Sequence, residues 1–139
     1  MNLDLSGQIA LVTGASRGIG KAVADELVKC GAKVIGTATT VDGAKAIDAR
    51  LKPSGGAGLA LNVTAPNACE EIIDQIVKEF GGINILVNNA GIAIFKPAEE
   101  ITFKDWTDVM ATNLNGTFLC SQACLPALIK GKGSIVNIA

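Results

Sequence analysis

Thr13-Gly14-Ala15-Ser16-Arg17-Gly18-Ile19-Gly20 is the stretch of sequence that decides the fold. It follows a short apolar run, residues 8–13, that is typical of a buried strand, and it leads into residues 18–30, where apolar residues recur at helical spacing. A strand, a glycine-rich turn and a helix N-terminus together favour an anion, because backbone N–H groups and the helix dipole both attract negative charge. The stretch therefore predicts a phosphate-binding turn. A tight turn that only packs a helix closely is the alternative interpretation.

The alternation of strand and helix continues along the rest of the chain. A capping box at Thr102–Asp105 starts a long helix that runs towards Lys130, with a break expected near Asn113. The other expected strands are residues 33–37, 58–62, 83–88 and 133–138, and the other expected helices are 42–51 and 66–80, with a loop at 53–56. This order predicts one α/β domain over residues 1–139, a doubly wound parallel sheet of the Rossmann type.

Composition excludes several classes of function. The 139 residues are 49% hydrophobic and 18% charged, with a formal net charge of -1 and no basic run, which argues against nucleic-acid and membrane-surface partners. No apolar stretch is long enough to span a bilayer and the N-terminus lacks a secretory pattern, so we expect a cytoplasmic protein. The absence of His excludes a Ser-His-Asp triad and a His-ligated metal.

The cysteines are four, Cys30, Cys69, Cys120 and Cys124, and none of them forms a C-x-x-C motif. Their spacing favours small apolar packing under reducing conditions over a metal-binding or redox role. We therefore expect no metal site.

The end of the second expected strand indicates which dinucleotide the turn would take. An Asp or Glu commonly holds the ribose hydroxyls of NAD at that point, but here the strand ends in Thr37-Ala38-Thr39. Arg17 lies within the glycine turn, and a cation there with the hydroxyls of Thr37 and Thr39 opposite would suit a 2′-phosphate. The sequence therefore predicts NADP(H) over NAD(H). Asp42, beyond the strand, is expected to serve the start of the next helix.

Several segments in order resemble the short-chain dehydrogenase/reductase family. The turn at 13–20 resembles its cofactor loop, Asn88-Asn89-Ala90-Gly91 its second signature, and Asn62-Val63 its adenine-contacting pair. Asn113 matches the Asn of its active-site tetrad, and residues 133–138 resemble the strand that leads to its catalytic Ser. The resemblance covers the whole chain.

The resemblance implies roles for individual residues. Asn113 would be the catalytic residue, interrupting its helix so that a backbone group can hold a water in a proton relay; the alternative is a polar residue that merely bends the helix. The residues expected to bind the cofactor are Gly14, Ala15, Ser16, Arg17, Gly18, Ile19, Gly20, Thr37, Thr39, Asn62, Val63, Asn89, Ala90 and Gly91.

The resemblance also implies a substrate class. Residues up to Gly91, and 33–39 above all, are most similar to bacterial 3-oxoacyl-acyl-carrier-protein reductases, whereas 92–97 is more similar to reductases of sugars and small ketones. We therefore expect NADPH-dependent hydride transfer to a ketone, with a 3-oxoacyl thioester as one candidate substrate, in a full-length homo-oligomer (dimer or tetramer). Only Lys130 and Lys132 would be at hand for an acidic carrier protein.

The remaining catalytic groups of that family are a Ser, a Tyr and a Lys four residues after the Tyr. The chain contains no Tyr. We therefore expect a Rossmann unit truncated after the fifth strand, inactive on its own, with an apolar strand edge left open. Two alternatives stay open: a non-catalytic NADP-binding module, and a structural fragment without useful affinity.

Overall fold

Strand and helix alternate from one end of the structure to the other. The structure is a computed structural model that describes residues 3–139. Its elements are β1 (Ile9–Val12), α1 (Gly18–Lys29), β2 (Lys33–Ala38), α2 (Val41–Leu51), β3 (Ala57–Ala60), α3 (Ala68–Phe80), β4 (Ile85–Asn88), α4 (Phe103–Met110), α5 (Gly116–Lys130) and β5 (Ser134–Asn137), with 3-10 turns η1 (Lys52–Ser54) and η2 (Ala98–Glu100) and a π-helical segment η3 (Ala111–Asn115).

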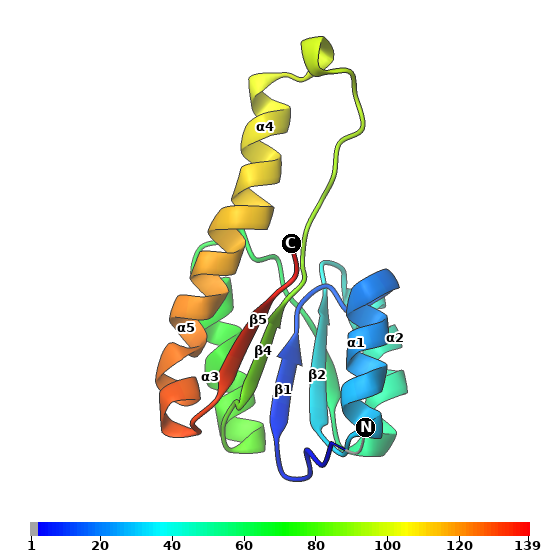
Figure 1. Ribbon diagram of the computed structural model, residues 1–139, viewed down its shortest axis with the longest axis vertical. Helices are drawn as coiled ribbons and strands as arrows, with labels where there is room; N and C mark the ends of the chain where they lie inside the picture. The colour runs from blue at the N-terminus through cyan, green and yellow to red at the C-terminus, as the bar shows by residue number, and fades with distance from the viewer. Residues whose placement is uncertain (1–2) are drawn as a thin grey trace.

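The strands form one parallel sheet in the order β3-β2-β1-β4-β5. Leu11 of β1 pairs with Ile35 of β2 on one side and with Leu86 of β4 on the other. Figure 1 shows α1 and α2 on one face of this sheet and α3 and α5 on the opposite face. The predicted doubly wound α/β fold is confirmed. The strand order reverses direction between β1 and β4, which is where ligands bind in sheets of this kind.

Each face of the sheet has its own hydrophobic core, and β1 contributes to both. Ala10 and Val12 pack into the core beneath α1 and α2, whereas Ile9 and Leu11 pack into the core beneath α3 and α5. Successive side chains of a strand point to opposite faces, so a strand buried on both sides must be apolar at every position. All four residues of β1 are buried, which explains why its sequence reads as an unbroken apolar run.

The boundaries of some expected elements differ from the structure. The third strand begins at Ala57 and ends at Ala60, so Asn62 lies beyond it, and the third helix begins at Ala68 after the left-handed backbone of Asn67 (φ 61°). The segment expected as a loop at 53–56 includes the end of a 3-10 turn, Lys52–Ser54. Local turn chemistry decides these ends, and hydrophobic periodicity does not report it.

The long C-terminal helix contains the expected interruption. Thr102 and Asp105 form the predicted capping box: the Asp105 N–H donates to Thr102 Oγ1 (3.0 Å) and the Thr102 N–H donates to Asp105 Oδ2 (3.1 Å). The helix then widens to a π-helical turn at Ala111–Asn115 before it continues as α5. Figure 1 shows α4 rising beyond the carboxyl edge of the sheet and α5 lying against the sheet.

β5 lies at the edge of the sheet with all four of its residues exposed. Within residues 3–139 only β4 pairs with it. Asn88 of β4 connects this edge to the rest of the fold, because its Nδ2 donates to Asn137 Oδ1 (2.9 Å) and to Ser121 Oγ of α5 (3.0 Å). None of the helices in the described part of the chain has the length and apolar character needed to cross a membrane.

The core beneath α3 gives a direct test of the fold. Ile76 is fully buried, whereas Ile129 of α5 is 69% exposed. We expect Ile76→Ala to lower the free energy of unfolding by about 2–5 kcal/mol through lost burial and a residual cavity. The matched substitution Ile129→Ala should change it by about 0.5 kcal/mol or less. Urea unfolding followed by circular dichroism measures both, and equal losses would contradict this packing.

Candidate functional site

A pocket of about 450 Å³ lies beyond the carboxyl ends of β1, β2 and β4. Most of the residues expected to bind a cofactor meet in its lining: Gly14, Ser16, Arg17, Gly18, Ile19, Thr39, Asn62, Val63, Asn89, Ala90 and Gly91. They come from loops that are far apart in the sequence but follow strands that end at the same edge of the sheet. The fold therefore brings together in one pocket predicted residues that run from Gly14 to Gly91 in the sequence.

The lining also includes residues that the sequence analysis missed. These are Ala38, Leu61, Ile92 and Thr112. Each one directly adjoins a residue that was predicted, so proximity to a strand end or to a motif is the signal that would have found them. Conversely, four predicted site residues are absent from the lining: Ala15, Gly20, Thr37 and Asn113.

The glycines of the loop are required by close backbone packing. Gly14 has φ +64°, and a Cβ there would lie 3.0 Å from Ala90 Cα. A Cβ on Gly20 would collide with the carbonyl oxygen of Gly14 and the side-chain amide of Asn89. That amide instead donates to the Gly14 carbonyl at 3.0 Å. The loop, the start of α1 and the segment after β4 are thus in contact without room for side chains between them.

Thr37 supports the glycine loop from below. Its side chain is 1% exposed; Thr37 Oγ1 accepts from the Gly14 N–H (3.3 Å), and its carbonyl accepts from the Ala15 N–H (2.8 Å). Its hydroxyl therefore fixes the loop, while the exposed Thr39 is the threonine that lines the pocket. Of the two hydroxyls expected opposite Arg17, only that of Thr39 is placed to face a ligand.

The start of α1 is open towards the pocket. Arg17 occupies the N-cap position, no side chain of residues 3–139 caps this end, and the first turn carries no acidic residue. The first N–H groups of a helix have no partner inside the helix, and they carry the positive end of its dipole. Together with the cation of Arg17, they form a region suited to a phosphate.

Arg50 of α2 holds the other side of the loop. Its Nη2 donates to the Ala15 carbonyl at 3.1 Å, and its Nε lies 3.3 Å from Asp25 Oδ1 of α1. The Ala15 carbonyl is thereby bonded to the Arg50 guanidinium, which fixes the loop at this point. No sequence motif marks Arg50 within α2, so the sequence alone does not predict its role.

Thr13 joins the ends of β1 and β4. Its hydroxyl oxygen accepts from the N–H groups of Asn89 (3.0 Å) and Ala90 (2.9 Å), and the hydroxyl donates to the Val87 carbonyl at 3.5 Å. Thr13 is 1% exposed, so these N–H groups have little access to water as an alternative partner. One buried hydroxyl therefore positions the segment that forms the floor of the pocket.

Asn113 lies in the π-helical segment and binds the backbone of Ile92 in both directions. Its Oδ1 accepts from the Ile92 N–H (2.8 Å) and its Nδ2 donates to the Ile92 carbonyl (2.9 Å). Its own carbonyl accepts from the Thr117 hydroxyl (3.0 Å). In this geometry Asn113 fastens the segment after β4 to the long helix, beside the lining residue Thr112.

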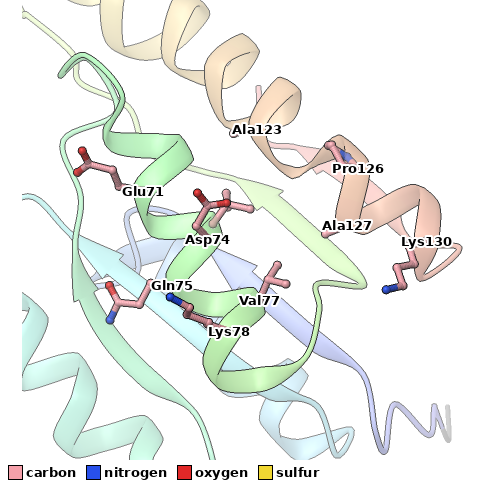
Figure 2. Close-up of a pocket in the computed structure, with 10 residues that line it drawn as sticks. Glu71, Asp74, Gln75, Val77, Lys78, Ala123, Pro126, Ala127 and Lys130 are labelled. Carbon is pink, nitrogen blue, oxygen red and sulfur yellow. The ribbon is translucent and has the colours of Figure 1, made fainter.

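A second, larger hollow of about 910 Å³ lies elsewhere, between α3 and α5. Figure 2 shows Val77 on α3 opposite Ala123 and Ala127 on α5, with Lys78 and Lys130 nearby. It lies on the face of the sheet that α3 and α5 cover, away from the glycine loop. The smaller pocket is the better candidate for a ligand site because polar groups and backbone N–H groups converge there.

Comparison with known proteins identifies the family of the chain. The family model described as short chain dehydrogenase matches residues 8–139. The chain is 49% identical over 137 residues to the 3-oxoacyl-acyl-carrier-protein reductase FabG of Vibrio cholerae, covering 98% of this chain and 56% of that protein. It is 42% identical over 138 residues to the D-threitol dehydrogenase of Mycolicibacterium smegmatis, covering 97% and 53%.

A solved structure has the same fold. The crystal structure of a Sinorhizobium meliloti protein described as a short-chain alcohol dehydrogenase superposes with a TM-score of 0.89 at 39% identity, over 99% of this chain and 56% of that one. The chain thus spans about half the length of the relatives that it matches.

Substitution of Thr13 tests whether its hydroxyl positions the segment after β4. Thr13→Val keeps the shape but leaves the N–H groups of Asn89 and Ala90 without an acceptor, so we expect a loss of about 2–4 kcal/mol in unfolding free energy. Hydrogen exchange at these two amides should also become faster. Thr13→Ser retains the hydroxyl and should restore slow exchange. Unchanged exchange in the Val variant would show that the hydroxyl does not position this segment.

Proposed function

This chain belongs to the short chain dehydrogenase family, and on that premise we propose that it binds NADP(H) in the pocket beyond β1, β2 and β4. The observation that carries the proposal is the uncapped start of α1, with Arg17 at its N-cap and Gly14 pressed against Ala90. A dinucleotide phosphate suits this cradle because it can accept from the free N–H groups and approach a backbone without side chains. Asn62, Val63, Asn89 and the pocket side of Gly91 would hold the rest of the nucleotide.

The preference for a 2′-phosphate follows from the charge at the end of β2. The pocket is lined there by Ala38 and Thr39, and no carboxylate takes part in its lining. Asp42 is in the first turn of α2, outside the lining, where Thr40 caps the helix by accepting from the Gly43 N–H (3.0 Å). A ribose diol would lack its usual acidic partner, whereas a phosphate would meet Arg17 and the Thr39 hydroxyl.

The proposed reaction is reduction of a ketone, with a 3-oxoacyl thioester as the first substrate to test. The bound cofactor would supply the hydride. The described residues would bind and orient it: the glycine loop would hold the phosphates, and the Asn113–Ile92 bonds would fix the wall beside the reacting end. A reductase of a 3-oxoacyl thioester is among the relatives at 49% identity, which supports this substrate class.

The proposed reaction also needs a proton donor that these residues do not contain. The family's general acid is a Tyr, and the 139 residues have none. We therefore propose that the 139 residues alone bind NADPH without oxidising it. That observation equally favours a second candidate function, a non-catalytic NADP-binding module.

We further propose that the complete enzyme is a homo-oligomer. The long helix exposes a set of large apolar side chains that water does not favour: Phe103 (79% exposed), Trp106 (56%), Phe118 (60%) and Ile129 (69%). Exposed apolar surface of this extent is typical of a protein interface.

Arg17 is the residue that tests the cofactor preference. We expect Arg17→Ala to weaken NADPH binding by about 10- to 100-fold, the loss of one charged hydrogen bond to phosphate, and to leave NADH binding nearly unchanged. Fluorescence titration of each reduced cofactor measures this. Lys29→Ala, at the far end of α1 where Lys29 meets only Glu26, is the matched control. Equal losses for both cofactors would contradict a 2′-phosphate contact.

The reductase proposal is tested by mixing the protein with NADPH and a 3-oxoacyl thioester and following the absorbance of the reduced nicotinamide. We expect binding, seen as a change in NADPH fluorescence, without turnover by the 139 residues. Sustained oxidation would show that another group acts as the acid. Failure to bind NADPH at millimolar concentration would overturn the cofactor assignment itself.

A further inference from the structure

Two cysteines from different helices are in contact in the hydrophobic core that α3 and α5 share with the sheet. Cys69 in the first turn of α3 and Cys120 in α5 place their Sγ atoms 3.0 Å apart, although they are separated by 51 positions in the sequence. Cys69 is 5% exposed and Cys120 is 1% exposed, and both belong to the core shared by α3 and α5. The sequence favours simple packing for these residues, but it could not show that two of them touch.

The two thiols are not equivalent. The hydrogen bond between the two sulfur atoms lowers the pKa of the Cys69 thiol, and the same bond, together with burial, raises the pKa of Cys120. Cys69 is also close to the N-terminus of α3, where the helix dipole favours a thiolate. Glu70 acts in the opposite direction, as a nearby negative charge. Both the contact and the position at the helix start therefore favour Cys69 as the thiol that reacts first.

The other two cysteines differ from this pair. Burial raises the pKa of Cys124 to about 12, which leaves it as an inert thiol one turn from Cys120. Cys30 is half-buried at the end of α1, on the opposite face of the sheet. Among residues 3–139 no group of three or more Cys, Asp or Glu side chains is placed to hold a metal ion.

We propose that Cys69 and Cys120 are a peroxide-sensitive dithiol that closes to a disulfide between α3 and α5. The Cys69 thiolate attacks one oxygen of hydrogen peroxide, the O–O bond breaks, and a sulfenic acid and water form once the leaving hydroxide has taken a proton. The Cys120 sulfur then attacks the Cys69 sulfur, the S–O bond breaks, and the Cys120 proton leaves with the hydroxyl as a second water. In total two thiols and one peroxide give one disulfide and two waters.

The geometry suits this closure. A disulfide bond is about 2.05 Å long, so the sulfur atoms need to approach by only about 1 Å from their present 3.0 Å. The proposal rests on this contact alone and is independent of the proposed cofactor.

The bridge would lie close to the pocket wall. Gly116, one turn before Cys120, packs so closely on Val63 that a Cβ on it would lie 2.5 Å from Val63 Cγ2. Val63 lines the pocket. Oxidation would therefore fasten α5 to α3 directly behind this wall.

The test is peptide mapping of the folded, fully reduced protein after treatment with hydrogen peroxide. Peroxide is removed with catalase, the protein is unfolded and alkylated, and disulfide-linked peptides are identified by mass spectrometry. We expect a Cys69–Cys120 linked peptide with Cys30 and Cys124 alkylated, reversed by dithiothreitol. The oxidised protein should unfold roughly 5–10 °C higher, because the link closes a long loop.

Single substitutions assign the roles. Cys120→Ser should abolish the link and leave Cys69 as a sulfenic acid that dimedone traps, and Cys69→Ser should abolish both products. Cys124→Ser is the matched control and should form the link as the wild type does. The proposal is overturned if all four thiols of the folded wild type stay alkylatable after peroxide, or if the link joins any other pair. The peptide map of the wild-type protein tests the proposal even if a variant fails to fold.

Discussion

The hydrogen bonds of one buried hydroxyl support much of the site. Thr13 stands where β1 ends, and its oxygen accepts the two backbone N–H groups that follow β4. Those bonds position Asn89, and the Asn89 amide in turn holds the Gly14 carbonyl. The glycine loop and the segment after β4 are therefore fixed to each other through a few short contacts, and the pocket between them keeps its shape without large side chains.

The parts of the structure that could be predicted are those decided by local pattern. β1 is buried on both faces and apolar throughout, and β4 is apolar up to Asn88, so both strands are visible in the sequence. The glycine spacing marks the loop because packing excludes a Cβ at Gly20. Side-chain direction at a strand end is different, since it depends on tertiary contacts. Thr37 was expected to face the ligand, but the Gly14 N–H draws its hydroxyl under the loop. The contacts of Arg50 and the meeting of Cys69 with Cys120 join distant helices, so no local pattern reveals them.

Two relatives with different substrate names match nearly the whole of this chain. A 3-oxoacyl reductase and a threitol dehydrogenase match nearly the whole chain at 49% and 42% identity. These two proteins are named for different substrates, and both matches extend over at least 97% of this chain, which includes the residues that build the pocket. The region after Gly91, by contrast, is exposed up to η2, with Phe95 at 95% exposure, apart from the half-buried Ile94.

The π-helical turn at Ala111–Asn115 determines which side of α5 faces the sheet. An ordinary helical turn holds 3.6 residues, and a π-helical turn accommodates one more, so α5 is rotated by about 100° relative to a continuous α-helix from α4. Cys120, Cys124 and Leu128 recur every fourth position and all face the sheet in that phase. The loss of a single residue from the wide turn would swing this apolar row out of the core. The length of that short segment is thus constrained by packing as well as by its contact with Ile92.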